Sequence, residues 1–175
     1  MKVYLQSIKT VQKLPIPLTE AWDFLTSPDN LKLLTPEELD MNIHYGSERK
    51  IYPGQLIEYT LKPLPFFKTN WVTHITQVKE LEFFVDEQMY GPYATWHHKH
   101  FIREIPGGTL MEDVVHYRLP LGFIGKLGLP LVRKKLEEIF RFRESALISH
   151  FGAFQEPTDH QTTPEESTMK HEILN

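Results

Sequence analysis

Two alternating segments joined by a Pro-Gly-Gly sequence constrain the fold of this chain more than any other feature. They lie at residues 94–105 and 109–119, within the stretch GPYATWHHKHFIREIPGGTLMEDVVHYRLP. Alternating side chains that run up to such a turn and resume after it predict two long antiparallel strands. The chain is therefore expected to contain an antiparallel sheet, and that sheet must bury one of its faces.

The first strand of this hairpin is expected to carry aromatic and polar side chains on one face. Because side chains alternate along a strand, the face holds Trp96, His98, His100 and Ile102. If Gly107-Gly108 forms a two-residue loop, the directly opposed pairs are Ile102 with Asp113, His100 with Val115, and His98 with Tyr117. Such a mixture of groups is typical of the wall of a ligand cavity rather than of a dry core.

The rest of the chain supplies further strands and one long helix. A first strand is predicted at 2–14, followed by short helices at 20–26, capped by Thr19, and at 31–34. Four more strands precede the hairpin, at 39–45, 55–62, 68–78 and 81–89. The long helix is predicted at 129–151, and the glycine-rich LGFIGKLGLP is expected to turn the chain into it. The expected fold class is α+β, an antiparallel meander of about seven strands covered by the long helix.

The predicted long helix is amphipathic, but two polar residues interrupt its apolar face. Its apolar stripe consists of Val132, Leu136, Ile139, Phe140, Ala146 and Leu147. Arg143 and His150 project into this stripe, where an unpaired charge is costly. If the stripe faces the sheet, the Arg143 guanidinium could anchor a ligand carboxylate or phosphate. The alternatives are an ion pair with Asp113 or Asp86, or a side chain that reaches water at the helix edge.

Composition and charge narrow the classes of partner. The chain has 175 residues, 41% of them hydrophobic, which suits one domain at 1–152 followed by a polar acidic tail at 153–175 that is expected to be disordered. It contains no cysteine and no apolar run as long as a membrane helix, so a cytoplasmic protein is expected. The net charge of −4 and the scattered lysines and arginines argue against nucleic acid as a partner. These features leave the oligomeric state open.

Several motifs, in their order along the chain, resemble the SRPBCC superfamily of START/Bet v 1-like proteins, which includes polyketide cyclases and lipid-transfer domains. They occur in AWDFLTSPDNLKLLTP at 21–36, FVDEQMYGPYATWHHKHFIRE at 84–104, LMEDVVHYRLPLG at 110–122 and IFRFRESAL at 139–147. The pattern looks most like a small bacterial ligand-binding group, through Phe84, Asp86, Gln88, Gly91, Pro92, Trp96, His98, His100, Phe140 and Arg143. The resemblance implies a helix-grip fold over residues 3–152, in which a curved sheet grips the long helix around an elongated cavity.

Such a cavity is compatible with three functions. The leading hypothesis is a protein that binds a small, mainly hydrophobic or amphipathic ligand without a cofactor. The residues expected to contact it are Tyr59, Trp71, Phe84, Gln88, Trp96, His98, His100, Asp113, Tyr117, Phe140 and Arg143. The first alternative is a polyketide cyclase- or dehydratase-like enzyme, in which His98 or His100 acts as a general base oriented by Asp113. The second is a protein-interaction module whose cavity is vestigial.

The two histidines also raise the question of a metal site. His98 and His100 point the same way on a strand and could supply two ligands. Asp113 is the nearest third ligand under the assumed register, and Asp86 is the next. Without a clear third ligand, no metal is expected. The alternative is a hydrogen-bonded network in which Asp113 fixes a histidine tautomer and Tyr117 lies at the other end.

Overall fold

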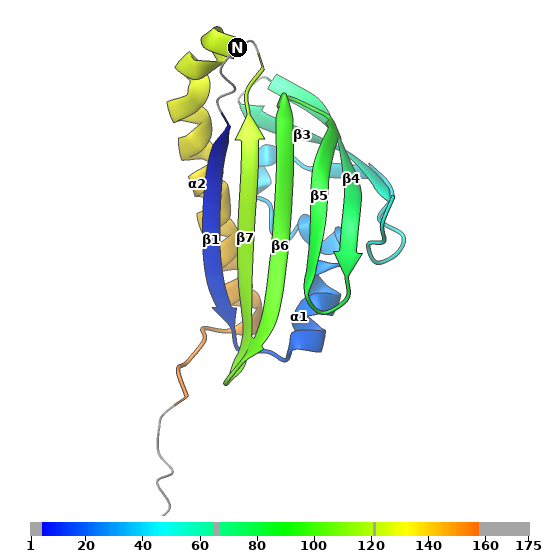
Figure 1. Ribbon diagram of the computed structural model, residues 1–175, viewed down its shortest axis with the longest axis vertical. Coiled ribbons are helices and arrows are strands. Elements are labelled where there is room, and N and C mark those ends of the chain that lie inside the picture. The colour runs from blue at the N-terminus through cyan, green and yellow to red at the C-terminus, as the bar shows by residue number, and fades with distance from the viewer. Residues whose placement is uncertain (1–4, 65–66, 121, 158–175) are drawn as a thin grey trace, which may run out of the picture.

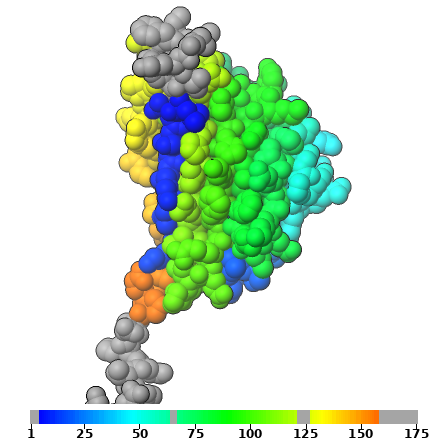
Figure 2. Space-filling view, viewed as in Figure 1, coloured from blue at the N-terminus to red at the C-terminus, as the bar shows by residue number. Residues whose placement is uncertain are grey.

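A computed structural model describes residues 5–64, 67–120 and 122–157. Its elements are β1 (Gln6–Leu14), α1 (Leu18–Leu25), the 3-10 helices η1 (Pro28–Leu31) and η2 (Glu37–Leu39), β2 (Asn42–Tyr45), β3 (Leu56–Leu64), β4 (Phe67–Lys79), β5 (Phe83–Tyr90), β6 (Thr95–Ile105), β7 (Gly108–Arg118) and α2 (Gly122–Phe151). The helices lie together on one side of the sheet (Figure 1). Figure 2 shows its other side, where the outer side chains of β1, β7, β6 and β5 form a surface that no helix covers.

The strands form one antiparallel sheet in the order β1-β7-β6-β5-β4-β3-β2. Strands β2 to β7 follow one another as a meander, and β1 pairs with β7 at the far edge. Long strands of this kind curve because each is twisted, which gives the sheet a concave face for the helices. The predicted α+β helix-grip fold, a seven-stranded sheet with a long C-terminal helix and short helices after the first strand, is therefore confirmed.

The pairing of β6 with β7 differs from the predicted register by two residues. His100 lies opposite Asp113, His98 opposite Val115, and Trp96 opposite Tyr117. The reason is that the two-residue loop is Pro106-Gly107 rather than Gly107-Gly108. A loop that moves by one position changes the pairing by two residues, and side chains alternate with a period of two. The predicted groups therefore still share one face, although their neighbours differ.

Gly107 makes this tight loop possible. Its φ is +82°, a left-handed conformation, and it follows a proline, as in a type II turn. We expect Gly107→Ala to lower the free energy of unfolding by about 1–2 kcal/mol, because a Cβ disfavours this conformation. Gly107→Asn should lose less, because asparagine adopts left-handed conformations more readily. Urea unfolding of both variants measures the difference, and equal losses would contradict this explanation.

The predicted starts of all three helices were wrong. Helix α2 begins at Gly122, contains Pro130, and includes the glycine-rich segment that was expected to precede it. Glycine and proline lower helix propensity, but propensity is a weak effect that tertiary structure overrides. Helix α1 begins at Leu18 after Pro17, and Thr19 does not cap it. The second short helix starts at Pro28, because proline's fixed φ suits the first position of a helix.

The predicted apolar stripe of α2 does face the sheet. Leu136, Phe140 and Leu147 are buried, and Val132, Ile139 and Ala146 are partly buried. His150 does not enter the stripe as expected, because it is exposed and its ring lies beside the rings of Phe24 and Phe151. Within the described ranges, no helix combines the length and the apolar character that crossing a bilayer requires.

The chain beyond α2 continues along the end of the sheet. A Cβ at Gly107 would lie 3.3 Å from Pro157 and 3.5 Å from Phe154, so both side chains sit near the β6–β7 turn. Lys13 forms an ion pair with Glu156 and lies 5.3 Å from the centre of the Phe154 ring. Residues 153–157 of the predicted tail therefore contact the folded domain. Residues 158–175, like residues 2–4 of the predicted first strand, lie outside the described residues.

Candidate functional site

A cavity of about 380 Å³ lies between the concave face of the sheet and the helices. Its walls come from the sheet, from α1 and η1, and from one face of α2, which contributes Leu131, Val132, Lys135, Leu136, Ile139, Phe140 and Arg143. Most lining side chains are apolar, and the polar exceptions include Asp86, His98, His100 and Arg143. Leu131 and Phe67 line the cavity and are also 57% and 50% exposed, so this side of the cavity reaches the surface.

The structure places most of the predicted contact residues on the cavity wall. Those that line it are Tyr59, Trp71, Phe84, Trp96, His98, His100, Phe140 and Arg143. Asp113 lies behind the two histidines rather than on the wall, in a separate groove lined by β1, β7 and α2. Gln88 and Tyr117 do not line the cavity either. The histidines and Arg143 are thus brought together, while these three predicted residues have other roles.

Gln88 and Tyr117 do not line the cavity but contact Tyr93, which does. The Gln88 side-chain amide donates to the carbonyl oxygen of Tyr93 at 2.7 Å, and its oxygen accepts from the Tyr93 backbone N–H at 3.0 Å. It therefore fixes the connection between β5 and β6. Tyr117 is 1% exposed and packs edge-to-face against the Tyr93 ring, with centroids 5.9 Å apart. Both residues position Tyr93, a cavity residue that the sequence reasoning missed.

Aromatic rings form one end of the cavity. The Trp71 ring stacks on Tyr59 with centroids 6.0 Å apart, and meets Trp96 and Tyr93 edge-on at 5.3 and 5.7 Å. The Trp71 Nε1–H donates to Thr73 Oγ1 at 3.0 Å, so its polar group is satisfied and the ring presents apolar surface. Burial raises the pKa of Tyr59 and Tyr93, which keeps both phenols neutral. This end suits an apolar or aromatic part of a ligand.

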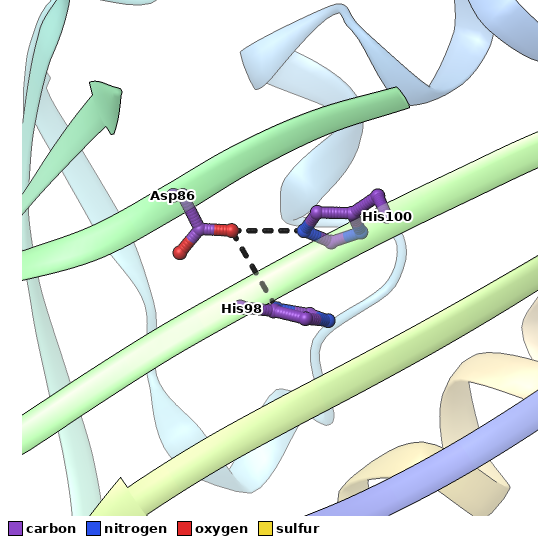
Figure 3. Close-up of side chains that lie close together, drawn as sticks. All are labelled: Asp86, His98 and His100. Atoms are coloured by element: carbon purple, nitrogen blue, oxygen red, sulfur yellow. Dashed lines mark hydrogen bonds and ion pairs between the residues drawn. The ribbon is translucent and has the colours of Figure 1, made fainter. Parts of the chain in front are cut away.

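A buried polar cluster forms another part of the wall (Figure 3). His98 and His100 come from β6 and Asp86 from β5, where Asp86 pairs directly with His98. Asp86 Oδ2 lies 2.8 Å from His100 Nε2 and 3.5 Å from His98 Nδ1. The two imidazole rings are 3.7 Å apart between centroids, and the Phe84 ring stacks on His100 at 4.0 Å. These contacts with Asp86, with Phe84 and between the two rings fix the orientation of both imidazoles.

Asp113 forms the layer behind these histidines. Its Oδ1 lies 3.1 Å from His98 Nε2 and 2.6 Å from His100 Nδ1, and its side chain is 1% exposed. Arg143 approaches from α2, with Nε 3.9 Å from Asp113 Oδ2. Among the described residues, three buried atoms of this layer have no partner with hydrogen-bond geometry: His100 Nδ1, Asp113 Oδ2 and Arg143 Nε. The contact of His100 Nδ1 with Asp113 is therefore close but poorly directed.

The pKa values in the cluster are set by burial and by neighbouring charges. Burial lowers the pKa of His98, and the adjacent His100 lowers it further. Burial also acts to lower the pKa of His100, but Asp113 and Asp86 outweigh it and raise that pKa. Burial opposes the charge on Asp113, yet Arg143 and His100 hold its pKa well below its ordinary value. Two buried carboxylates thus face one permanent cation, Arg143.

Asp86 lines the cavity, although the sequence analysis named it only as a second choice of metal ligand, after Asp113. It lies two positions from Phe84 on the same strand, so alternation puts both side chains on the cavity face. That signal was present in the sequence. The pairing of Asp86 with His98 was not, because it depends on the connection between β5 and β6 rather than on a tight turn. The predicted polar network exists, but it includes Asp86 and Arg143 and does not include Tyr117.

Comparisons with known proteins support the fold. No protein-family model matches the chain, and no curated protein matches it in sequence. The Zhui aromatase/cyclase from a Streptomyces species superposes with a TM-score of 0.68 at 8% identity, over 84% of this chain and 93% of that chain. The protein TTHA0849 from Thermus thermophilus gives 0.64 at 14% identity, over 83% and 99%. Thalictrum flavum norcoclaurine synthase, a point mutant with a transition-state analogue, gives 0.61 at 12% identity, over 86% and 98%.

These likenesses show a shared fold. The chain shares its fold with these three proteins, so the fold implied by the SRPBCC resemblance is confirmed. The identities lie far below those at which a reaction or a ligand carries over between proteins. What the cavity of this chain does therefore has to be argued from its own residues.

Proposed function

We propose that the protein binds a small, mainly hydrophobic or amphipathic molecule between the sheet and α2. The observation that carries this proposal is the cavity of about 380 Å³, which is mainly apolar and has its charged side chains gathered in one cluster. Ligand sites commonly have volumes of about 300–1,000 Å³ and combine apolar walls with a few polar groups that orient the ligand. The apolar part of the ligand would lie among Trp71, Trp96 and Tyr93, and its polar end would meet Arg143 and the histidines.

A bulky side chain inside the cavity tests this proposal. Ile139 lines the cavity from α2, whereas Ile148 lies on the outer side of the same helix and is 42% exposed. We expect Ile139→Trp to weaken binding of the amphipathic probe 8-anilinonaphthalene-1-sulfonate at least about 10-fold, or about 1.4 kcal/mol, because the indole occupies the site. Ile148→Trp should leave the affinity unchanged. Fluorescence titration of the folded proteins measures both, and equal affinities in all three proteins would contradict the proposal.

The natural ligand can be sought directly. Native mass spectrometry of protein purified from its own source, followed by denaturation, identifies any small molecule that is released. A stoichiometric amphipathic compound would support the proposal and name the chemistry to test against Arg143 variants. The same compound could then be used in place of the probe with Ile139→Trp.

A second candidate function is an enzyme of the cyclase or dehydratase kind. The observation that favours it is that His98 and His100 line the cavity while Asp113 contacts both from behind. A histidine oriented by a carboxylate is a common general base. Incubating the protein with the released compound, followed by mass analysis, would detect any change, and a turnover that survives His98→Gln and His100→Gln would sink this candidate. The third hypothesis, an interaction module with a vestigial cavity, gains no support from an apolar cavity of this volume.

The remaining expectations also stand as proposals. We place the ligand-binding domain at residues 1–152, followed by the polar tail at 153–175, whose residues 153–157 contact the end of the sheet. A cytoplasmic location rests on the lack of cysteine, and the absence of nucleic-acid partners rests on the net charge of −4. No cofactor is required for binding an apolar molecule in the cavity.

A further inference from the structure

Three potential metal ligands converge at the polar cluster. Asp86 Oδ2, His98 Nδ1 and His100 Nε2 lie on the cavity wall, and one ligand atom from each falls within 4.8 Å of the others. The oxygen is 2.8 Å from His100 Nε2 and 3.5 Å from His98 Nδ1. Ligands at zinc distances in tetrahedral geometry are separated by about 3.3 Å, and the two separations from the Asp86 oxygen lie within about 0.5 Å of this value. Two imidazoles and one carboxylate are a common ligand set for first-row metals.

The opposite nitrogens of both histidines reach the same buried carboxylate. His98 Nε2 and His100 Nδ1 lie 3.1 and 2.6 Å from Asp113 Oδ1. Metal-bound histidines usually donate their other N–H to such a group, which fixes the tautomer and the ring orientation. With a metal on His98 Nδ1 and His100 Nε2, the remaining N–H of His98 would donate to Asp113 Oδ1, and that of His100 would lie close to the same oxygen but poorly directed toward it. The three potential ligands therefore line the cavity, and Asp113 lies behind the two histidines.

The charges of the cluster also suit a cation. Asp86 is a partly buried carboxylate and Asp113 a fully buried one, with side chains 14% and 1% exposed. Among the described residues, Arg143 is the one lysine or arginine within ion-pair distance of either of them. Buried charges need partners, and Arg143 balances only one of the two carboxylates, so a proton on a histidine or a bound cation must supply the second positive charge. A divalent ion supplies it, and its remaining coordination positions would face the cavity.

We propose that Asp86, His98 and His100 bind a divalent first-row transition-metal ion such as Zn²⁺, with Asp113 as the supporting carboxylate. This proposal goes beyond ligand binding and does not depend on it. The sequence alone favoured no metal, because it offered no clear third ligand: Asp113 was the nearest candidate under the assumed register, and Asp86 was the next. The observed pairing of β5 with β6 instead brings Asp86 beside both histidines.

The test is titration of protein that carries no affinity tag and has been freed of metal by chelation. We expect Zn²⁺ to bind with a 1:1 stoichiometry and a dissociation constant of about 1 µM or tighter by calorimetry. Co²⁺ should bind with visible absorption, whereas Mg²⁺ should not compete, because imidazole is a poor ligand for it. Failure of the wild-type protein to bind either Zn²⁺ or Co²⁺ at 1:1 would overturn the proposal.

Matched variants distinguish Zn²⁺ binding at this site from nonspecific Zn²⁺ binding by surface histidines. Asp86→Asn, His98→Gln and His100→Gln should each weaken Zn²⁺ binding by more than about 100-fold, and Asp113→Asn by about 10–100-fold. His97→Gln is the control, because its ring nitrogen bonds Glu87 at 2.8 Å on the opposite face of β6. Unchanged affinity in the three ligand variants, or loss in the control, would refute the site. If a ligand variant does not fold, X-ray absorption of Zn²⁺-loaded wild-type protein decides: two imidazoles at about 2.0–2.1 Å support the site, and fewer refute it.

The metal titration and the probe titration remain independent of each other. Zn²⁺ binding is measured without the amphipathic probe, and probe binding is measured in metal-free protein. A cavity that binds the probe but no metal would refute only the metal site. A cluster that binds metal in a protein whose Ile139→Trp variant still binds the probe normally would refute only the proposed ligand site.

Discussion

Arg143→Met is expected to lower the free energy of unfolding by about 3–5 kcal/mol. The guanidinium lies 3.9 Å from Asp113 Oδ2, and the two side chains are 12% and 1% exposed. Methionine fills much of the same volume but removes the permanent cation, so the Asp113 carboxylate stays buried with less compensation. Removing one partner of a buried ion pair costs more than the pair itself contributes, because the remaining charge keeps its desolvation penalty. Urea unfolding in the presence of a chelator measures the loss without contributions from metal.

Two further variants show whether the loss arises from the buried charge. Arg141→Met changes an exposed arginine two positions earlier in the same helix and should alter stability by no more than about 0.5 kcal/mol. Arg143→Met combined with Asp113→Asn removes both charges, so the double variant should be less destabilised than the sum of the single variants. Strict additivity would contradict the coupling that the structure indicates between Arg143 and Asp113.

The hairpin shows why the sequence could predict which side chains share a face. Alternation fixes the face of every residue in β6, whatever its partner, so Trp96, His98 and His100 were placed together correctly. The register could not be fixed, because Pro106-Gly107 and Gly107-Gly108 both satisfy the preferences of a tight loop. The choice between them depends on the pairing of the whole sheet, which includes β1 against β7.

The candidate site was harder to predict than the fold. Residues on the same face of the sheet do not all line the cavity. Asp113 and Tyr117 lie on the inner face of β7, but α2 packs nearby and leaves them away from the cavity wall. Asp86 depends on the pairing of β5 with β6, which no short turn determines. The cluster of Asp86, His98 and His100 therefore requires a correct register between β5 and β6. Local sequence patterns predict the face on which each side chain lies, but not which residues of the neighbouring strands lie beside it.

The long helix was predicted well where burial determined its pattern and poorly where it did not. The positions Leu136, Phe140 and Leu147 follow the 3.6-residue period and are buried. Its start was placed too late because glycine and Pro130 signal a break in the sequence, although the structure continues the helix through them. The C-terminal end of α2, by contrast, packs against α1 through buried core residues. Substitutions of these residues test its orientation.

Leu147→Ala should lower the free energy of unfolding by about 2–5 kcal/mol, because its side chain is 0% exposed and its removal leaves a cavity. Leu147 belongs to the core cluster that joins α2 to Trp22 of α1 and to Phe84 beside the histidines. Ile148→Ala, at the adjacent exposed position, should change stability by about 0.5 kcal/mol or less. Urea unfolding measures both, and similar losses would contradict the observed orientation of α2. Because the same cluster holds Phe84 against His100, Leu147→Ala should also weaken Zn²⁺ binding, whereas Ile148→Ala should not.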